Sequence, residues 1–149
     1  MKRIIIGSDH AGFKLKNEII KLLKKKRFFV RDVGAFCEES CDYPVFASAV
    51  AKAISLGKYK KGILICKSGI GNSIVANKFK GVRAALCYNV LAARLSRQHN
   101  DSNVLILGSA FVKKALARKI VDVWINTEFE GGRHLRRVNL IKKIEKNRR

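Results

Sequence analysis

The hydrophobic positions of this chain fall into five short, continuous runs, separated by longer segments with helical spacing. The runs are rich in β-branched residues, which is typical of strands buried on both faces of a sheet. The predicted strands are residues 3–7, 28–33, 62–66, 82–87 and 104–108. The predicted helices are residues 12–26, 44–57, 70–79, 89–98 and 111–126, with a last helix at about 133–146.

Strands that alternate with helices indicate βαβ units, which build a parallel sheet with helices on both faces. The predicted fold class is therefore α/β, a three-layer α/β/α sandwich around a five-stranded parallel sheet. The chain has no internal repeat, low-complexity segment or linker. We expect residues 1–149 to form a single domain, in which Gly131 and Gly132 are a hinge before a C-terminal helix that starts at about 133.

The composition argues against a disordered, a membrane-spanning and an exported protein. The chain has 149 residues, of which 48% are hydrophobic, and a single proline, and these values argue against disorder. No apolar run reaches the ~20 residues that a membrane span needs. The apolar stretch near the N-terminus is too short for a signal peptide. We therefore expect a cytoplasmic protein with no membrane partner.

The formal charge of +21 favours two kinds of partner, a polyanion or a small anion that is steered by the field. The lysines are spread over many segments, and aromatic residues do not interleave with them as they do on a base-stacking surface. Solvated basic helix faces account for this distribution. Nucleic acid is therefore not the expected partner, and a polyanion-binding module is kept as the alternative from another functional class.

Polar residues follow two of the predicted strands. Asp9 and His10 come directly after the first strand, and Cys66 ends the third. Asp9 alone could cap the first helix, and His10 alone could be an ordinary loop residue. Ligands of such sheets gather at the carboxyl ends of the strands, so the three side chains together favour a site.

Cys66 differs from the other cysteines in the segment that follows it. The loop 67–71 leads into a helix start, where backbone N–H groups suit an oxyanion or phosphate and can lower a thiol pKa. Cys87 ends the fourth strand without such a loop and reads as a small buried hydrophobe. Cys37 and Cys41 lack a nearby histidine or second cysteine pair, so no metal site is predicted, and all four thiols are expected to be free.

The polar segment 96–103 contains His99, a candidate acid or base near neutral pH. Because it precedes the fifth strand, His99 should lie at the amino edge of the sheet, opposite Cys66. To share a site with Cys66 it must come from a second copy, which predicts a homodimer with shared active sites.

Arg133 and Arg137 lie on one helix face, where they could clamp a phosphate or form a solvated basic face.

Taken together in order, these segments resemble the type B ribose-5-phosphate isomerases, in the family that also holds galactose-6-phosphate isomerase subunits. The matching segments are residues 7–12, 42–44, 66–71, 76–78, 81–84, 95–101, 103–105 and 131–134. Each segment is a weak signal, but the ordered set spans almost the whole chain and is specific. The resemblance implies a Rossmann-like sheet and interconversion of ribose 5-phosphate and ribulose 5-phosphate, a step of the pentose phosphate pathway, without metal or organic cofactor.

The resemblance also implies a role for each matching residue. Cys66 would be the base that moves a proton between C1 and C2 through an enediolate, and the loop 67–71 would donate backbone N–H groups to the oxyanion. His99 would assist opening of the sugar ring, with Asp9 nearby, while Asn100 would reach the sugar across the dimer. The implied catalytic residues are Cys66, His99, Asp9 and Ser68. The implied substrate-binding residues are Asp9, His10, Lys67, Ser68, Gly69, Ile70, Gly71, Asn100, Arg133 and Arg137.

One departure from the family pattern concerns Lys67, where the family usually has glycine. A lysine is strained there if the position needs a positive φ. Its ammonium could stabilise the enediolate, meet the phosphate or point into solvent. A hexose 6-phosphate, such as allose or galactose 6-phosphate, is the alternative substrate on the same fold, and pairing of dimers into tetramers stays open.

Overall fold

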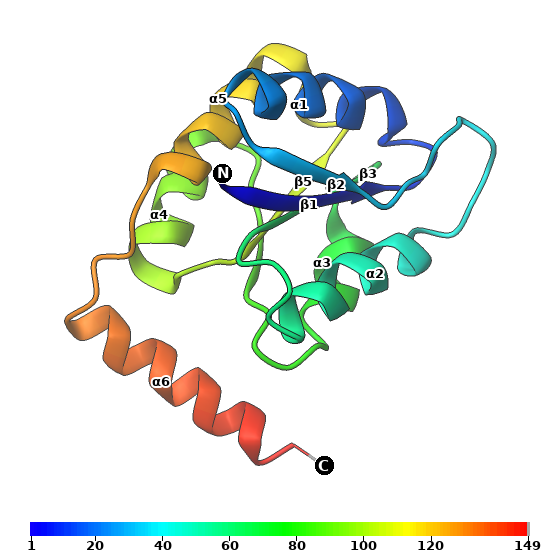
Figure 1. Ribbon diagram of the computed structural model, residues 1–149. Helices are drawn as coiled ribbons and strands as arrows, with labels where there is room; N and C mark the ends of the chain where they lie inside the picture. Colours follow the sequence, from blue (N-terminus) through cyan, green and yellow to red (C-terminus); the bar gives the residue numbers. More distant parts are fainter. Residues whose placement is uncertain (149) are drawn as a thin grey trace.

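A five-stranded parallel sheet forms the centre of the fold (Figure 1). The computed structural model describes residues 1–148. The strands, in the order β2-β1-β3-β5-β4, are β1 (Arg3–Ser8), β2 (Phe29–Asp32), β3 (Gly62–Cys66), β4 (Ala84–Leu86) and β5 (Val104–Gly108). The helices are α1 (Phe13–Lys25), α2 (Tyr43–Ser55), α3 (Ile70–Ala76), α4 (Val90–Asn100), α5 (Lys114–Asn126) and α6 (Arg133–Lys146).

Helices cover both faces of the sheet, so the predicted α/β/α layers and the parallel sheet are confirmed. Successive residues of β3 alternate between the two cores. Ile63 and Ile65 pack with α1, α4 and α5 around the buried Trp124, whereas Leu64 packs with α2 and α3. This explains the continuous apolar runs, because a central parallel strand is buried on both faces.

The largest differences from the predicted bounds are the three residues missing from the end of α3 and from the start of α5, and the two edge strands are also shorter than predicted. β2 and β4 are shorter than the predicted runs 28–33 and 82–87. Each of them pairs on one side only, with β1 and β5 respectively. A similar shortening occurs at α5, which starts at Lys114 because the N–H of Val112 bonds back to the carbonyl of Gly108 in a turn.

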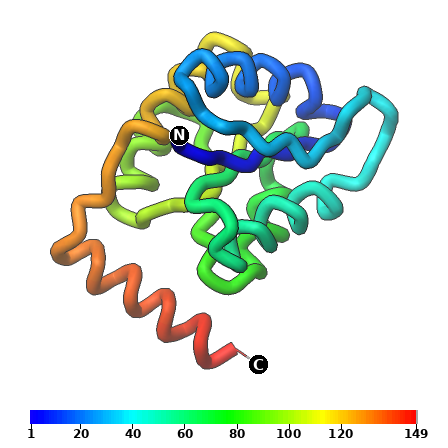
Figure 2. The backbone as a smooth tube through the Cα atoms, in the orientation of Figure 1, coloured from blue at the N-terminus to red at the C-terminus, as the bar shows by residue number. Residues whose placement is uncertain are grey.

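Helix α6 projects from the rest of the chain, beyond α4 (Figure 2). Gly131 and Gly132 precede it with φ values of 69° and 55°, which are conformations that glycine adopts readily. Within α6, Glu145 Oε1 accepts the N–H of Gly81 at 2.8 Å. Large apolar side chains along α6 remain exposed, namely Leu135, Leu140, Ile141 and Ile144.

No helix within residues 1–148 is long and apolar enough to cross a membrane.

A buried lysine anchors the loop between β2 and α2. Lys16, on α1, has a fully buried side chain, and its Nζ donates to both carboxylate oxygens of Asp32, at 2.7 and 2.8 Å. It also donates to the carbonyl of Ala35 at 2.6 Å and lies 5.1 Å from the centre of the Phe36 ring. These contacts fix the first residues of the loop, and the end of that loop contacts His10.

Replacing Lys16 by Met is expected to lower the free energy of unfolding by about 2–3 kcal/mol, because it leaves Asp32 and the Ala35 carbonyl without their donor. Urea unfolding measures the change. Lys21, on the same helix, pairs with Glu18 on the surface, so Lys21→Met should cost less than about 0.5 kcal/mol. Equal effects of the two substitutions would contradict the assignment.

Candidate active site

The carboxyl ends of β1 and β3 meet, as the sequence predicts. Ser8 is the register partner of Ile65, and the N–H of Asp9 donates to the carbonyl of Ile65 at 3.3 Å. Asp9 is buried, and its Oδ1 accepts the N–H of Gly12 at 3.1 Å, so the carboxylate also organises the turn into α1. Asp9 and Cys66 are close enough that the negative charge of Asp9 raises the pKa of the thiol.

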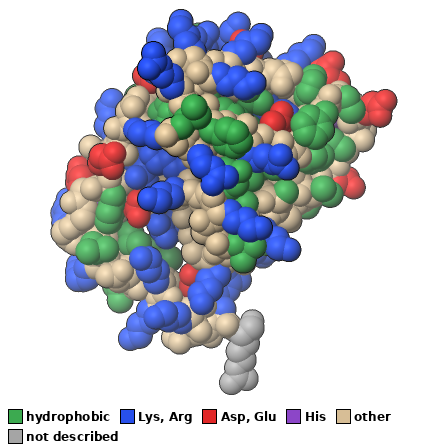
Figure 3. Space-filling view, viewed as in Figure 1, with side chains coloured by type: hydrophobic (Ala, Val, Ile, Leu, Met, Phe, Trp, Pro, Cys, Tyr) green, Lys and Arg blue, Asp and Glu red, His purple; other side chains and the backbone are tan. Residues whose placement is uncertain are grey.

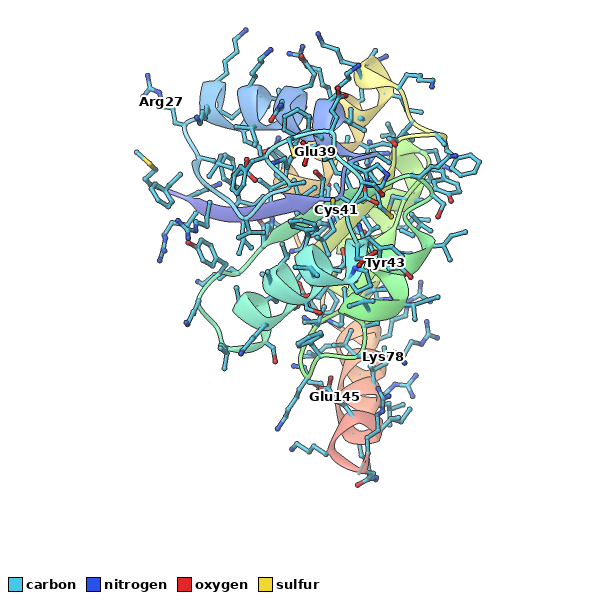
Figure 4. The ribbon with its side chains drawn as sticks, turned by 90° about the vertical axis from the view of Figure 1, so that its right-hand side faces the viewer. Arg27, Glu39, Cys41, Tyr43, Lys78 and Glu145 are labelled. Atoms are coloured by element: carbon cyan, nitrogen blue, oxygen red, sulfur yellow. The ribbon has the colours of Figure 1, made fainter. Side chains whose placement is uncertain are left out.

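His10 is held from the β2–α2 loop. The backbone N–H of Cys41 donates to His10 Nδ1 at 3.2 Å, and the Cys41 Sγ lies 3.8 Å from the same atom. Figure 4 shows Cys41 near Tyr43, at the end of this loop. Because Nδ1 accepts a hydrogen bond, the neutral ring carries its proton on Nε2, which is then a donor. This contact was not predicted from the sequence.

The loop after Cys66 directs several amides toward the sulfur. The N–H of Gly69 donates to Cys66 Sγ at 3.2 Å, and the amides of Asn72 and Ser68 also stabilise the thiolate. Gly69 has a φ of 83°, which turns the chain back toward the sulfur. The N–H of Ile70 donates to the hydroxyl oxygen of Ser68 at 3.1 Å. Two of the five backbone amides of the loop 67–71, those of Ser68 and Gly69, therefore face the sulfur.

The expected lowering of the Cys66 pKa is wrong. Cys66 is only 4% exposed, and burial raises the pKa of the thiol above its usual value, with Asp9 adding to the increase. The three amides oppose this shift without reversing it. At Cys87, burial raises the pKa to about 11, and the Ser96 hydroxyl is the opposing group there. The two cysteines thus differ in their hydrogen bonds, as predicted, although both shifts are upward.

Lys67 is accommodated without backbone strain. Positive φ values at non-glycine residues of the described chain occur at Arg27 and Asp101, not at Lys67. The Lys67 side chain is exposed, and its carbonyl accepts the N–H of Ala110 at 2.9 Å. A lysine can therefore stand where the family pattern has glycine.

The other predicted residues gather at the amino edge. His99 lies near the end of α4 and stacks on His134 of α6, with ring centroids 4.1 Å apart. Asn100, the last residue of α4, and the arginines Arg133 and Arg137 are exposed. This group is held by a network in which Asp101 bridges two arginines. The contacts are Arg97 Nη1 to Asp101 Oδ1 at 2.9 Å and Arg83 Nη2 to Asp101 Oδ2 at 3.1 Å.

One chain therefore holds the predicted site residues in two separate groups, which we treat as candidate half-sites. We call Asp9, His10 and the segment 66–71 the thiol half-site, and His99, Asn100, Arg133 and Arg137 the basic half-site. β3 and β5 run side by side in register, so the start of β5 and the end of β3 are roughly 15 Å apart. The expected position of His99 at the edge opposite Cys66 is confirmed.

These half-sites are found on a chain with clear relatives. Residues 4–141 match the ribose/galactose isomerase family. The ribose-5-phosphate isomerase B of Escherichia coli (strain K12) is 50% identical over 148 residues, which cover 99% of each chain. The chain belongs to the ribose/galactose isomerase family. The predicted family and enzyme class are thus confirmed.

Solved structures of the family share the fold. The ribose-5-phosphate isomerase B of Clostridium thermocellum superposes with a TM-score of 0.95 at 51% identity, covering 97% of each chain. The Mycoplasma genitalium enzyme, solved with bound ribulose-5-phosphate, gives a TM-score of 0.94 at 44% identity, covering 98% of this chain and 97% of that one.

In the described part of the chain, polar side chains without a hydrogen-bond partner lie beside the thiol half-site. Three cavities of about 400, 610 and 590 Å³ occur in residues 1–148, and none of these three is lined by Cys66. Beside the half-site, the hydroxyl of Ser8 and the side-chain amide of Asn72 are buried without a hydrogen-bond partner among the described residues. Such groups cost stability, so their presence favours a role toward a ligand or water.

Sequence reasoning missed three contributors to these half-sites. The ring of Tyr43 packs so closely on Gly71 that a Cβ at Gly71 would lie 2.4 Å from the ring. The hydroxyl of Tyr88 donates to the carbonyl of Ser68 at 2.9 Å. His134 stacks on His99, and burial together with the charge of His99 lowers its pKa. Both Tyr43 and His134 fall within segments that match the family, which was the available signal.

The basic half-site also contains a cluster of possible metal ligands. Ligand atoms of His99, Glu130 and His134 lie within 4.8 Å of one another. The two imidazole planes are nearly parallel, at 8°, and stacked. A metal ion is bound in the plane of each imidazole ring, so both rings cannot direct a lone pair at one ion in this arrangement.

Proposed function

We propose that the chain is an aldose–ketose isomerase that interconverts D-ribose 5-phosphate and D-ribulose 5-phosphate. The observation that carries the proposal is the thiol half-site, in which a buried sulfur next to Asp9 is faced by several backbone amides. Its relatives of Escherichia coli and Mycoplasma genitalium support the choice of substrate, because both bear the name ribose-5-phosphate isomerase B.

Cys66 is the proposed base. The C–H next to a carbonyl is a weak acid, so the base that removes its proton must be strong. Burial raises the pKa of the thiol, which reduces the thiolate fraction and makes the thiolate that forms a stronger base. The amides of Ser68, Gly69 and Asn72 limit this increase. The same sulfur then returns the proton to the neighbouring carbon while the hydroxyl proton passes between O2 and O1, so that C1 and C2 exchange oxidation states without a cofactor.

The loop 67–71 is the proposed oxyanion site. An enediolate bears negative charge on oxygen, and one well-placed donor is worth about 3–4 kcal/mol. Because Gly69 donates to the sulfur and Ile70 to Ser68, the amides of Lys67 and Gly71 are the first candidates for the substrate oxygen. When the thiolate accepts the substrate proton, the donors on the sulfur lose their charged acceptor, and Gly69 can then turn to the enediolate.

A homodimer completes the proposed site. The basic half-site of a second copy would supply His99 for ring opening, with Asp9 nearby, and Asn100 for the sugar hydroxyls. Arg133 and Arg137 would bind the phosphate together with His10 of the first copy, whose Nε2 is a donor. The exposed apolar side chains of α6 support an association of copies, because such residues are typical of interfaces.

The substrate assignment predicts a preference for five carbons. We expect kcat/KM for ribose 5-phosphate to exceed that for allose 6-phosphate at least about tenfold, because an added carbon displaces either C1 or the phosphate from its group. A ketose-coupled assay on both substrates gives the ratio. A preference for the hexose would move the assignment to the alternative substrate of the family.

Cys66→Ala should reduce kcat by about 10²–10⁴-fold, because it removes the base. Cys87→Ala is the matched control, since Cys87 directly follows β4, is buried, and its thiol hydrogen-bonds to Ala85 and Ser96 and not to the loop 67–71. That control should keep its kcat. Circular dichroism checks that both variants fold, and turnover of Cys66→Ala at the wild-type rate would exclude Cys66 as the base.

Shared sites predict complementation between two inactive variants. Cys66→Ala and His99→Asn should each be inactive as homodimers, whereas unfolding and refolding an equal mixture forms heterodimers. Each heterodimer has one intact site, so the mixture should recover about a quarter of wild-type activity. A double variant, Cys66→Ala with His99→Asn, mixed with itself is the control. A mixture that stays inactive although heterodimers form would contradict a site built from two copies.

A further inference from the structure

A basic cavity lies at the amino edge of the sheet, away from the thiol half-site. Its volume is about 610 Å³, and it lies between the start of β1, the loop before β3 and the end of α5. Five basic side chains line it, against one carboxylate, Glu128. The basic residues are Lys2, Arg3, Lys58, Lys60 and Lys61.

The walls of this cavity are well defined. The guanidinium of Arg3 donates to the Tyr59 hydroxyl at 3.2 Å and lies 4.6 Å from the centre of the Tyr59 ring. Phe28 and Ile125 supply apolar surface. Figure 3 shows that Lys and Arg side chains cover much of the visible face, so positive charge alone does not single out this cavity. What singles it out is one amine.

Lys61 differs from the surface lysines. Its Nζ donates to the carbonyl of Ile125 at 3.1 Å and lies 5.4 Å from the centre of the Trp124 ring. Trp124 is fully buried, so the amine reaches the edge of the main core. The pKa of Lys61 is lowered to about 8, mainly by burial and in smaller part by the charges of Arg97 and Lys2, while Glu128 and Asp101 oppose the change. About a tenth of this amine is therefore neutral at pH 7, far more than for a lysine with the ordinary pKa.

We propose that this cavity binds small phosphorylated aldehydes and that Lys61 forms an imine with them. The cationic rim, with Lys2, Lys58 and Lys60, would hold the phosphate dianion. The Nζ lone pair attacks the aldehyde carbon and forms the C–N bond. The carbonyl oxygen then leaves as water with the two hydrogens of the neutral amine. No oxidant, reductant or metal is needed, and the step is reversible.

Two properties favour this ligand class over a simple phosphate ion. An imine needs a neutral amine, and a pKa of about 8 in place of 10.5 gives about 300-fold more neutral amine at pH 7. The volume of the cavity is also within the usual range of small-molecule sites, and Lys61 lines it together with the rim lysines that would hold the phosphate. The inference is independent of the isomerase proposed above, since Lys61 takes no part in either half-site.

The experiment uses pyridoxal 5′-phosphate as the probe on the full chain. A limiting amount is added, the imine is reduced with borohydride, and the modified lysine is identified by peptide mass spectrometry. We expect the main adduct at Lys61, with a rate that rises with pH around 8. Pyridoxal without its phosphate should react at least about tenfold more slowly, because it gains nothing from the cationic rim.

The variants separate a specific site from general lysine reactivity. Lys61→Arg keeps the charge and cannot form the imine, so the main adduct should disappear, whereas Lys21→Met on the surface should leave it unchanged. Isomerase activity should be the same in Lys61→Arg and in the wild type, so failure of either proposal can be recognised by itself. Adducts spread over many lysines, or formed first at the amino group of Met1, would overturn the inference.

Discussion

The structure of this chain depends on the single direction of its strands. In a parallel sheet, every residue that follows a strand lies at one edge, and every residue that precedes a strand lies at the other. Cys66 follows β3, and His99 and Asn100 precede β5, its neighbour in the sheet. No side-chain movement brings these groups together within one chain. The chemistry of the thiol and that of the basic residues therefore belong to two surfaces.

The separation of the two groups bears on the projecting position of α6. α6 carries Arg133 and Arg137 on a glycine hinge, and His134 fixes its start by stacking on His99. Had α6 folded back on the sheet, its arginines would have become part of the surface of their own chain. Because α6 stands away from the sheet, the arginines and most of the apolar residues between them and Lys146 stay exposed, and in the proposed homodimer they would face the second copy.

The sequence predicted the central parts of the fold well because burial dictates them. β1, β3 and β5 have continuous apolar runs, and their predicted bounds agree with the structure within one residue. The edge strands β2 and β4 were predicted too long, since apolar residues such as Val82 and Cys87 also pack outside a strand. The candidate site residues come from the family pattern, which does not give their hydrogen bonds. The contact between Cys41 and His10 joins residues 31 positions apart, and no local pattern encodes it.

The pKa of Cys66 illustrates why a motif alone does not determine chemistry. Counting N–H donors in the loop 67–71 gave the wrong sign, because the count omits the loss of water around a sulfur that is 4% exposed. Burial acts on every charged form, so it raises the pKa of a thiol and lowers that of an amine. The same cause therefore operates in opposite directions at Cys66 and Lys61. In the proposed mechanism this cause strengthens the thiolate of Cys66 as a base toward a C–H proton, and in the proposed cavity chemistry it frees the lone pair of Lys61 for attack on a carbonyl.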